Sequence, residues 1–598
     1  MGLSDGFCKG RGGSMHLRWV EAGAMGTNAI VGGGVPIANG LAWAQRRRGK
    51  GEVTFTFFGD GGMNIGAVPE SMNLAALWNL PICFFVENNG YAVSTTLEEE
   101  TKETRLSSRG GAYAIPAFRV DGMDPVAVKI ASEMAIEHMR SGKGPTIIEA
   151  IVYRYFHHGG SVHGSAFGYR KKDEEAEWMA MDPLQRTVRE LIKLKWITPE
   201  QNEQIRQNCV SAMQDVSALT TEGEGAKRRV RPDLWPKTEF RDQGLRGDLS
   251  ELAGVRTEEL ETASGKVADV KFVDSVAAVM GRRMETDDRI FCMGEDIHRL
   301  KGGTNGATKG LADRFPDRII PTPIAEQGFV GLAGGVAMEG SYRPVVELMY
   351  ADFALVAADQ LFNQIGKARH MFGGESPMPI VIRTKCAMGT GYGSQHSMDP
   401  AGMYALWPGW RIVAPSTPFD YVGLMNSALK CEDPVLVIEH TDLYNVTALG
   451  PVDDFDYFIP LGKAKKVREG KKFTVLTYLA MTRLAIQAAE QLGLDAEIID
   501  LRSLDRAGID WETIGESIKK TNNVVVLEQS PLTVSYGAML TDEIQRRYFD
   551  YLDQPVQRIH GGEASPSVSK VLERAAFVGL EEIKEGFARV MAGMGSPI

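Results

Sequence analysis

The chain has few cysteines, and their spacing gives them no shared chemistry. Its 598 residues include six of them, at Cys8, Cys83, Cys209, Cys292, Cys386 and Cys431. Since no two form a CxxC pair, the sequence predicts neither a zinc site nor a disulfide framework. Cysteines without a predicted disulfide framework fit a reducing compartment, so we expect a cytoplasmic protein.

Long apolar runs and an excess of positive charge are also missing. Without a stretch of eighteen apolar residues, no membrane span is predicted. The N-terminus has neither a signal-peptide layout nor a myristoylation pattern. A net charge of −11 argues against nucleic acid as the main ligand. With 43% apolar residues, a chain of this length is expected to form several domains with large cores.

Two common phosphate-binding motifs are incomplete. Residues 32–37 and 59–64 both lack the third glycine of GxGxxG, and no Walker A sequence occurs. A pyridine-nucleotide dehydrogenase is therefore disfavoured.

What the chain does have is two apolar runs that each end in an oxygen-bearing residue. The run 53–58 leads into Gly59-Asp60-Gly61, and the run 82–87 leads into Asn88-Asn89. With a helix between them, over 64–79, these runs form a parallel βαβ unit whose strand ends lie at one edge of the sheet. Carboxylate and amide oxygens suit Mg²⁺ with a bound phosphate. Gly61 and Gly62 are expected to open the helix and offer N–H groups to an anion.

Strands and helices alternate along most of the chain, which predicts parallel, doubly wound α/β sheets. Further strands are expected at 146–152, 289–293, 344–348, 379–383, 410–414, 434–439, 474–479, 496–500 and 523–527, and helices at 36–48, 124–141 and 329–338. The domains predicted are 1–215, 266–460 and 461–598. A polar, flexible linker is expected at 216–265.

The Gly-Asp-Gly and Asn-Asn pair resembles the thiamine-diphosphate motif. The whole chain resembles the decarboxylating first component of 2-oxoacid dehydrogenase complexes, with α and β subunits fused. Residues 10–16, 30–32, 75–81 and 119–124 match the α subunit, and 322–326 and 395–397 match the β subunit. This resemblance implies a transketolase-like fold, with thiamine diphosphate and Mg²⁺ as cofactors.

The resemblance assigns roles within the α-type region. Asp60, Asn89 and the carbonyl of Tyr91 match the Mg²⁺ ligands, and Gly61 and Gly62 match donors to the diphosphate. The residues implied to bind the cofactor here are Ala29, Val31, Gly59, Asp60, Gly61, Gly62, Asn89, Tyr91 and Val93. The backbone at Ala29 and Val31 would hold the aminopyrimidine. Val93 would support the bent cofactor, although a valine there is equally a core residue.

The resemblance also assigns roles within the β-type region. Glu326 matches the glutamate that bonds the aminopyrimidine ring and relays the proton by which the thiazolium carbon is activated. Phe353 matches the aromatic residue that stacks on that ring. Glu295 matches an acid near the site, for which a turn carboxylate is the alternative reading.

His158 and His396 match the two active-site histidines, one from each subunit type. Either histidine would donate a hydrogen bond to the substrate and would transfer a proton while the acyl group passes to the lipoyl sulfur. Because two residues are inserted in the segment 154–161 relative to the family pattern, His157 is an alternative to His158.

The resemblance implies a lipoyl-bearing dihydrolipoamide acyltransferase as partner, a small 2-oxoacid as substrate and a homodimer of the fused chain. The segment 89–95 is more like branched-chain and acetoin enzymes than pyruvate enzymes. Transketolase and deoxyxylulose-phosphate synthase share the fold and cofactor, but residues 395–397 and the α-to-β order argue against both.

The α subunit of this family continues upstream of the position matched by Gly6, with a Tyr-Arg pair that helps to bind the diphosphate. A catalytically impaired, assembly-only paralogue is therefore the competing expectation.

Overall fold

The computed structural model describes residues 2–237, 242–303 and 305–593. The chain divides into two compact units. The first consists of residues 1–241 with 371–375, and the second of 242–370 with 376–598. No helix in the described ranges has both the length and the apolar character needed to cross a membrane.

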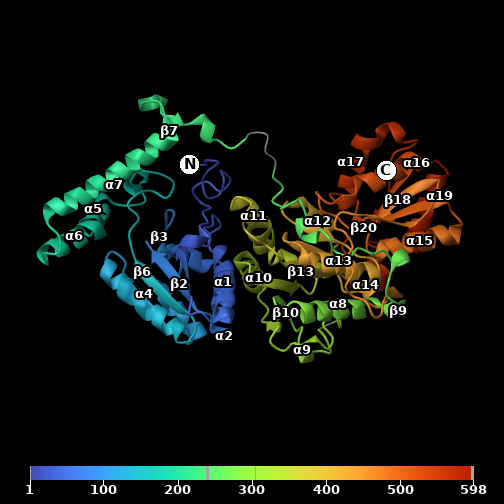
Figure 1. Ribbon diagram of the computed structural model, residues 1–598, viewed down its shortest axis with the longest axis horizontal. Coiled ribbons are helices and arrows are strands. Elements are labelled where there is room, and N and C mark those ends of the chain that lie inside the picture. Colours follow the sequence, from blue (N-terminus) through green and yellow to red (C-terminus); the bar gives the residue numbers. More distant parts are fainter. Residues whose placement is uncertain (1, 238–241, 304, 594–598) are drawn as a thin grey trace. The chain divides into compact units, whose positions relative to one another are not determined.

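The first unit contains a four-stranded parallel sheet, in blue and cyan in Figure 1. Its strands, in spatial order, are β1 (Thr54–Gly59), β2 (Ile82–Asn88), β6 (Thr146–Ile151) and β5 (Ala117–Asp121). The helices α1 (Gly34–Arg48) and α2 (Ala67–Leu77) lie on one face, and α4 (Pro125–Arg140) on the other. Since Gly59 is in register with Glu87, the carboxyl ends of β1 and β2 meet at one edge.

Local signals fix the helix ends of this unit. Asp124, the residue before α4, accepts hydrogen bonds from the N–H groups of Val126 at 3.0 Å and Ala127 at 3.4 Å. Pro125 follows at the first helical position, where its missing N–H costs nothing. The predicted helix over 124–141 is thereby confirmed.

Four helices and two short hairpins complete this unit. The first hairpin is β3 (Tyr91–Ala92) with β4 (Thr95–Thr96), and the second is β7 (Thr221–Glu222) with β8 (Arg229–Val230). The helices are α3 (Leu97–Glu100), α5 (Lys172–Ala180), α6 (Pro183–Lys193) and α7 (Pro199–Thr220). The boundary predicted at residue 215 was wrong, because it falls inside α7. No residue of α7 is buried, and its polar surface has the composition of a linker.

The second unit begins with a six-stranded parallel sheet. In spatial order its strands are β11 (Ile319–Thr322), β10 (Ile290–Glu295), β12 (Arg343–Glu347), β13 (Val381–Cys386), β15 (Val435–His440) and β14 (Arg411–Val413). Its helices include α8 (Phe272–Thr286), α9 (Leu311–Arg314), α10 (Glu326–Glu339), α11 (Gly366–Met371), α12 (Ala401–Leu406), α13 (Pro418–Lys430) and α14 (Thr441–Tyr444). The antiparallel strands β9 (Val267–Lys271) and β16 (Thr447–Pro451) pair beside it.

A five-stranded sheet completes the second unit. Its order is β17 (Lys465–Arg468), β19 (Ala496–Asp500), β18 (Phe473–Thr477), β20 (Val524–Pro531) and β21 (Gln557–Gly561), with β17 antiparallel. Its helices are α15 (Ala480–Leu492), α16 (Trp511–Thr521), α17 (Tyr536–Tyr548), α18 (Lys570–Glu573) and α19 (Leu580–Met591).

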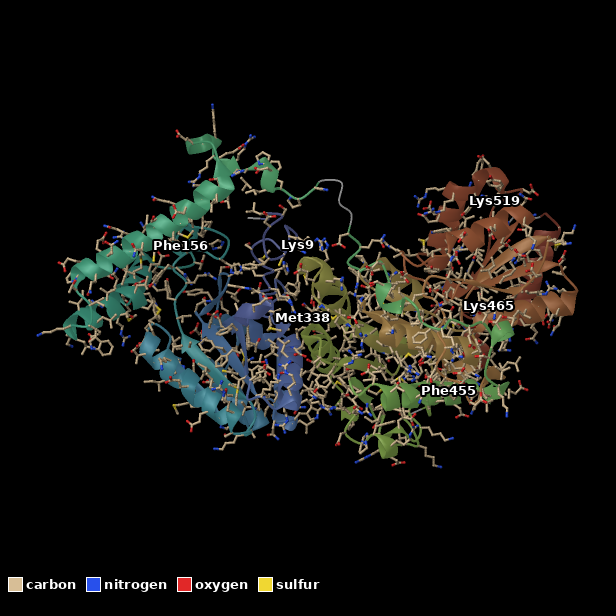
Figure 2. All side chains as sticks on the ribbon, viewed as in Figure 1. Lys9, Phe156, Met338, Phe455, Lys465 and Lys519 are labelled. Carbon is tan, nitrogen blue, oxygen red and sulfur yellow. The ribbon has the colours of Figure 1, made fainter. Side chains whose placement is uncertain are left out.

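One hydrophobic cluster runs through both sheets of this unit. Val345 and Val475, which come from different sheets, both belong to it, and Phe455 packs against it (Figure 2). The regions predicted as separate domains on either side of residue 460 therefore share a core.

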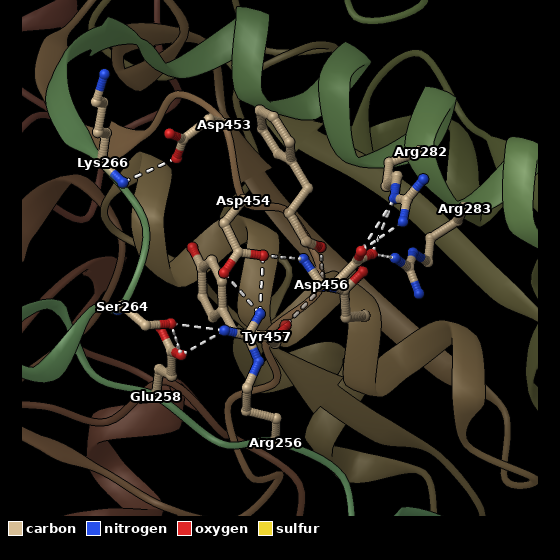
Figure 3. A network of polar contacts seen from close by, with 12 residues as sticks. Arg256, Glu258, Ser264, Lys266, Arg282, Arg283, Asp453, Asp454, Asp456 and Tyr457 are labelled. Atoms are coloured by element: carbon tan, nitrogen blue, oxygen red, sulfur yellow. Dashed lines mark hydrogen bonds and ion pairs between the residues drawn. The ribbon is translucent and has the colours of Figure 1, made fainter.

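Part of the predicted linker is firmly packed. The guanidinium of Arg256 bonds the carboxylates of Asp454 at 2.7 Å and Glu258 at 2.7 Å, and the Lys266 N–H donates to Asp453 at 2.8 Å (Figure 3). The Glu258 N–H also donates to the carbonyl of Phe458 at 3.1 Å. The expectation of a flexible linker was thus wrong for residues 242–265, whose charges are paired on the second unit. Residues 238–241 of that linker lie outside the described ranges.

Candidate active site

Asp60 lies at the carboxyl end of β1 with its side chain withdrawn from solvent. The residue is 2% exposed, and its Oδ2 atom is buried without a hydrogen-bond partner in the described chain. Burial raises the pKa of this carboxyl, while backbone N–H groups and the charge of Arg154 lower it. An unsatisfied buried carboxylate oxygen is costly unless a cation or donor meets it. The site therefore fits a bound Mg²⁺.

The two glycines after Asp60 lie in a 3-10 turn, η2 (Asp60–Asn64), and not at the start of an α-helix. The helix α2 begins only at Ala67, so the prediction that Gly61 and Gly62 open it was wrong. A Cβ on Gly61 would lie 2.8 Å from the Cβ of Ala92, and one on Gly62 would lie 3.0 Å from the Phe58 ring. Close packing explains why side chains are excluded here, and it keeps the backbone of the turn bare.

The other predicted metal ligands follow β2. The Asn89 Oδ1 accepts the N–H of Tyr91 at 3.2 Å, which closes a tight turn and holds the Tyr91 backbone beside it. The neighbouring Asn88 is buried and donates to Glu149 at 2.8 Å, so it has a structural task. The structure therefore distinguishes the two asparagines: Asn88 is buried in a structural contact, whereas Asn89 is half-buried and its side-chain oxygen lies on the turn.

Val93 has an unusual backbone conformation. Its φ is +61°, although β-branched residues rarely adopt left-handed angles. The side chain is 45% exposed, which disfavours the alternative that Val93 is a core residue. Its carbonyl accepts the guanidinium of Arg154 at 2.6 Å, and this contact holds the strained turn. Strain of this kind is concentrated at functional sites.

Glu100 is a second acid at this site that the sequence did not reveal. Its Oε1 is buried without a partner in the described ranges, and its Oε2 would lie 3.5 Å from a Cβ built on Gly61. Burial, and then the charge of Asp60, raise the pKa of Glu100. Two neighbouring carboxylates with unsatisfied oxygens form a charge arrangement that a divalent cation stabilises. The sequence does not single out Glu100, because it stands in a run of three glutamates, 98–100, of which the other two are exposed.

His157 and His158 differ clearly in their surroundings. The His157 Nδ1 atom lies 3.2 Å from the Tyr169 hydroxyl, and the centre of its ring lies 4.4 Å from that of the Phe167 ring at an angle of 36°. His158 is exposed, and its ring has no hydrogen bond, ion pair or aromatic contact within the described part of the chain. His157 is thus the histidine that the fold holds in place, whereas the predicted His158 is free to turn.

Ala29 and Val31 lie in the turn before α1, and both are exposed. The preceding Asn28 shapes this turn, because its Oδ1 accepts the N–H of Ile30 at 2.8 Å.

In the second unit the structure brings Glu295 and Glu326 together. Glu295 ends β10, and Glu326 is the first residue of α10 and not, as predicted, a residue before the helix. Burial raises the pKa of Glu295 to about 7, and the carboxylates of Glu326 and Asp296 add to the rise. The Glu295 Oε1 is buried and lacks a partner among the described residues. A protonated acid beside a carboxylate is suited to holding and moving a proton.

The same unit brings Phe353 and His396 into contact. Their rings lie 5.5 Å apart at 67°, and Tyr350 packs edge-on against both, at 5.7 Å from Phe353 and 4.8 Å from His396. Phe353 lies in the 3-10 turn η9 (Ala351–Leu355) after β12. The aromatic cluster therefore gives a stacking surface beside a titratable ring.

We expect Glu295 to make the stability of the second unit depend on pH. Because its native pKa of about 7 exceeds the usual unfolded value, the native state binds the proton more tightly. The stability that this proton contributes is complete below about pH 4.3 and is lost as the pH rises through 7. The melting temperature of the Glu295→Gln variant should therefore fall less between pH 5 and 8 than that of the wild type. Parallel profiles would contradict this, and Glu516→Gln, an exposed acid on α16, is the control.

The predicted residues thus form three groups. Asp60, Asn89, Tyr91 and Val93 lie around the ends of β1 and β2. In the second unit Glu295 lies near Glu326, and Phe353 contacts His396. Nowhere in the described ranges do three His, Cys, Asp or Glu side chains gather as a metal site.

Three family models match successive parts of the chain. Residues 1–225 match the dehydrogenase E1 component, 269–447 the transketolase pyrimidine-binding domain and 462–583 the transketolase C-terminal domain. The β-type half accordingly has a transketolase-like α/β fold.

Curated relatives match just over half of the chain. The mitochondrial pyruvate dehydrogenase E1 β subunit of Dictyostelium discoideum is 37% identical over 328 residues, which cover 54% of this chain and 91% of that protein. A chloroplastic β-2 subunit from Arabidopsis thaliana is 38% identical over 328 residues, covering 54% and 79%. Among solved structures, an inactive β4 tetramer of a split-gene transketolase covers 55% of this chain and 99% of its own, with 20% identity and a TM-score of 0.43.

Proposed function

Because this chain belongs to the E1 family of 2-oxoacid dehydrogenase components, with α-type and β-type regions in one polypeptide, we propose that it decarboxylates a small 2-oxoacid on thiamine diphosphate. We further propose that it transfers the resulting acyl group to a lipoyl group of a dihydrolipoamide acyltransferase. Family membership supports the thiamine-dependent 2-oxoacid decarboxylase role. The lipoyl acceptor and the choice of oxoacid go beyond what family membership supports, and both are part of the proposal. A cytoplasmic location stays a prediction.

The observation that carries the proposal is the buried, unpartnered Asp60 carboxylate oxygen at the edge where β1 and β2 end. Asp60, Asn89 and the Tyr91 carbonyl would hold Mg²⁺, and the N–H groups of Gly61 and Gly62 would face the diphosphate. Hard oxygen donors at the carboxyl edge of a parallel sheet suit a metal-bound phosphate.

Residues of the second unit would handle the proton. Thiamine diphosphate, when bound, supplies an electron sink for the carbanion left by decarboxylation. Glu326 would exchange a proton with the pyrimidine ring, and Phe353 would stack on that ring. His396 would donate a proton to an oxygen of the substrate, or to the lipoyl sulfur that is released as a thiol when the other sulfur takes the acyl group. The rings of Tyr350 and Phe353, which pack against the His396 ring, would hold that ring during the transfer.

The test separates the proposal from its alternatives. The purified chain is titrated with thiamine diphosphate and Mg²⁺, and then supplied with pyruvate, branched-chain 2-oxoacids or acetoin and an artificial electron acceptor. Addition of a lipoyl domain then tests acyl transfer. We expect saturable cofactor binding and turnover of one substrate class. Absence of cofactor binding would instead identify an assembly-only paralogue.

We also propose that the fused chain forms a homodimer. Both halves of the predicted cofactor site are encoded in one polypeptide, and twofold symmetry is the commonest closed arrangement. Sedimentation velocity with the cofactor present should give a species of about twice the 65.4 kDa chain mass. A monomer that binds the cofactor at full stoichiometry would refute this proposal.

A further inference from the structure

The loop that carries His396 is built on three glycines in left-handed conformations. It spans residues 387–397 after β13, and φ is +87° at Gly389, +82° at Gly391 and +84° at Gly393. Glycine lowers the barrier to such angles but gives a loop no rigidity of its own. The position of His396 therefore depends on contacts made from outside the loop.

Glu573 makes the contacts that fix the first half of the loop. Its Oε1 accepts the Gly389 N–H at 2.8 Å, and its Oε2 accepts the Gly391 N–H at 3.1 Å. The residue is 2% exposed and comes from α18, at the far end of the chain. Hydrogen bonds to a buried carboxylate are stronger than those between neutral groups.

Glu573 is itself held rigidly. Its own N–H donates to the Ser569 carbonyl at 2.8 Å, and its carbonyl accepts the N–H groups of Ala576 at 2.9 Å and Phe577 at 3.1 Å. These backbone hydrogen bonds hold the Glu573 carboxylate in place, so it can anchor the loop.

The loop also packs without space against the segment around Glu573. A Cβ on Gly389 would lie 2.9 Å from the Phe577 ring, and one on Gly391 would lie 3.2 Å from the Val568 carbonyl. Both glycines therefore allow the approach that brings their N–H groups to Glu573.

A second set of hydrogen bonds connects His396 to the backbone of the same loop. The His396 N–H donates to the Gly393 carbonyl at 3.2 Å, and its carbonyl accepts the Ala387 N–H at 3.1 Å. The Ser397 hydroxyl also donates to Gly393, at 2.8 Å. With its backbone tied at both ends, the His396 ring lies against Tyr350 and Phe353.

We propose that Glu573 is a positioning residue that anchors the 387–397 loop and sets the orientation of the His396 ring for proton transfer. This inference rests on the proposed function. It assigns to the C-terminal region, which contributes no group to the predicted site, a role in the chemistry.

The test is Glu573→Gln. A glutamine offers one acceptor oxygen and turns its NH₂ group toward the second N–H donor, so one anchor is lost. Hydrogen exchange of a peptide spanning 387–397 should accelerate about tenfold, and acyl transfer to a lipoyl domain should slow by about tenfold. Affinity for thiamine diphosphate should not change.

The matched control is Glu582→Gln. The Glu582 carboxylate accepts a backbone N–H, that of Gly579, at 3.0 Å in the same region without contacting the loop. It should alter neither measurement. Gly391→Ala should release the same loop by another route, because an alanine is strained at a φ of +82°. This variant leaves Glu573 in place.

A double-mutant cycle with His396→Gln separates positioning from general stability. If Glu573 acts through His396, the double variant transfers acyl groups no more slowly than His396→Gln alone. Additive losses, or unchanged loop exchange in both Glu573→Gln and Gly391→Ala, would overturn the inference. A wild-type chain without any activity would overturn the proposed function, and the exchange comparison would then decide alone whether Glu573 holds the loop.

Discussion

Replacement of Asp60 by alanine is expected to abolish the Mg²⁺-dependent binding of thiamine diphosphate. The substitution removes the carboxylate that we propose as the charged Mg²⁺ ligand. This residue is 2% exposed at the end of β1, and its Oδ2 lacks a partner in the described chain. Loss of an outer-shell partner already costs about 10–100-fold in metal affinity, so loss of a direct ligand should exceed about 100-fold. Calorimetric titration with the cofactor, with and without Mg²⁺, measures the effect.

The fold should survive this change. Burial raises the pKa of Asp60, so the native state gains nothing from an uncompensated charge there. Asp121→Ala is the matched control, since Asp121 ends β5 of the same sheet and pairs with Arg186 at 2.8 Å. Exposed ion pairs contribute little, so this variant should bind the cofactor normally. Unchanged affinity in Asp60→Ala would remove the metal assignment.

Much of the fold could be predicted from apolar runs, because buried parallel strands are continuous in hydrophobicity. The runs at 82–87, 290–293 and 435–439 all form central strands with neighbours on both sides. The edge strands β1 and β14 were also predicted, but the edge strands β5 and β11 escaped notice. β5 alternates exposed and half-buried residues, and β11 has only four, so neither has a long apolar run.

The linker was misread for a related reason. Residues 242–265 are polar, and composition alone cannot reveal that Arg256 pairs with Asp454 nearly two hundred residues away. In α7, polarity marks a helix with no buried residue instead of an unstructured segment.

The candidate site was predicted where motifs are local in sequence. Asp60 and Asn89 follow adjacent strands, and their spacing is set by a single βαβ crossover. Glu100 and Glu573 were missed because their relevance lies in contacts across the fold: Glu100 approaches Gly61, and Glu573 reaches Gly389. Neither acid has neighbours in sequence that distinguish it from an exposed glutamate.

The replacement Glu326→Gln is expected to leave cofactor binding intact while removing most of the catalysis. Glu326 is buried at the start of α10, where its charge contributes to the raised pKa of Glu295. An amide of the same shape keeps the packing but cannot exchange a proton with the pyrimidine ring. Loss of general acid–base help lowers rates by about 10²–10⁴-fold. Hydrogen–deuterium exchange at the thiazolium carbon of the bound cofactor, followed by NMR after acid quench, isolates this step from substrate binding.

The control for that experiment is Glu339→Gln, at the opposite end of the same helix. Its carboxylate accepts the N–H of Ser341 at 3.0 Å and has no part in the Glu295 pair. Exchange should therefore be slowed in Glu326→Gln alone. Equal exchange in the wild type and Glu326→Gln would place the proton relay on another residue. Glu295 is then the candidate to test next, because its pKa of about 7 keeps a proton available near neutral pH.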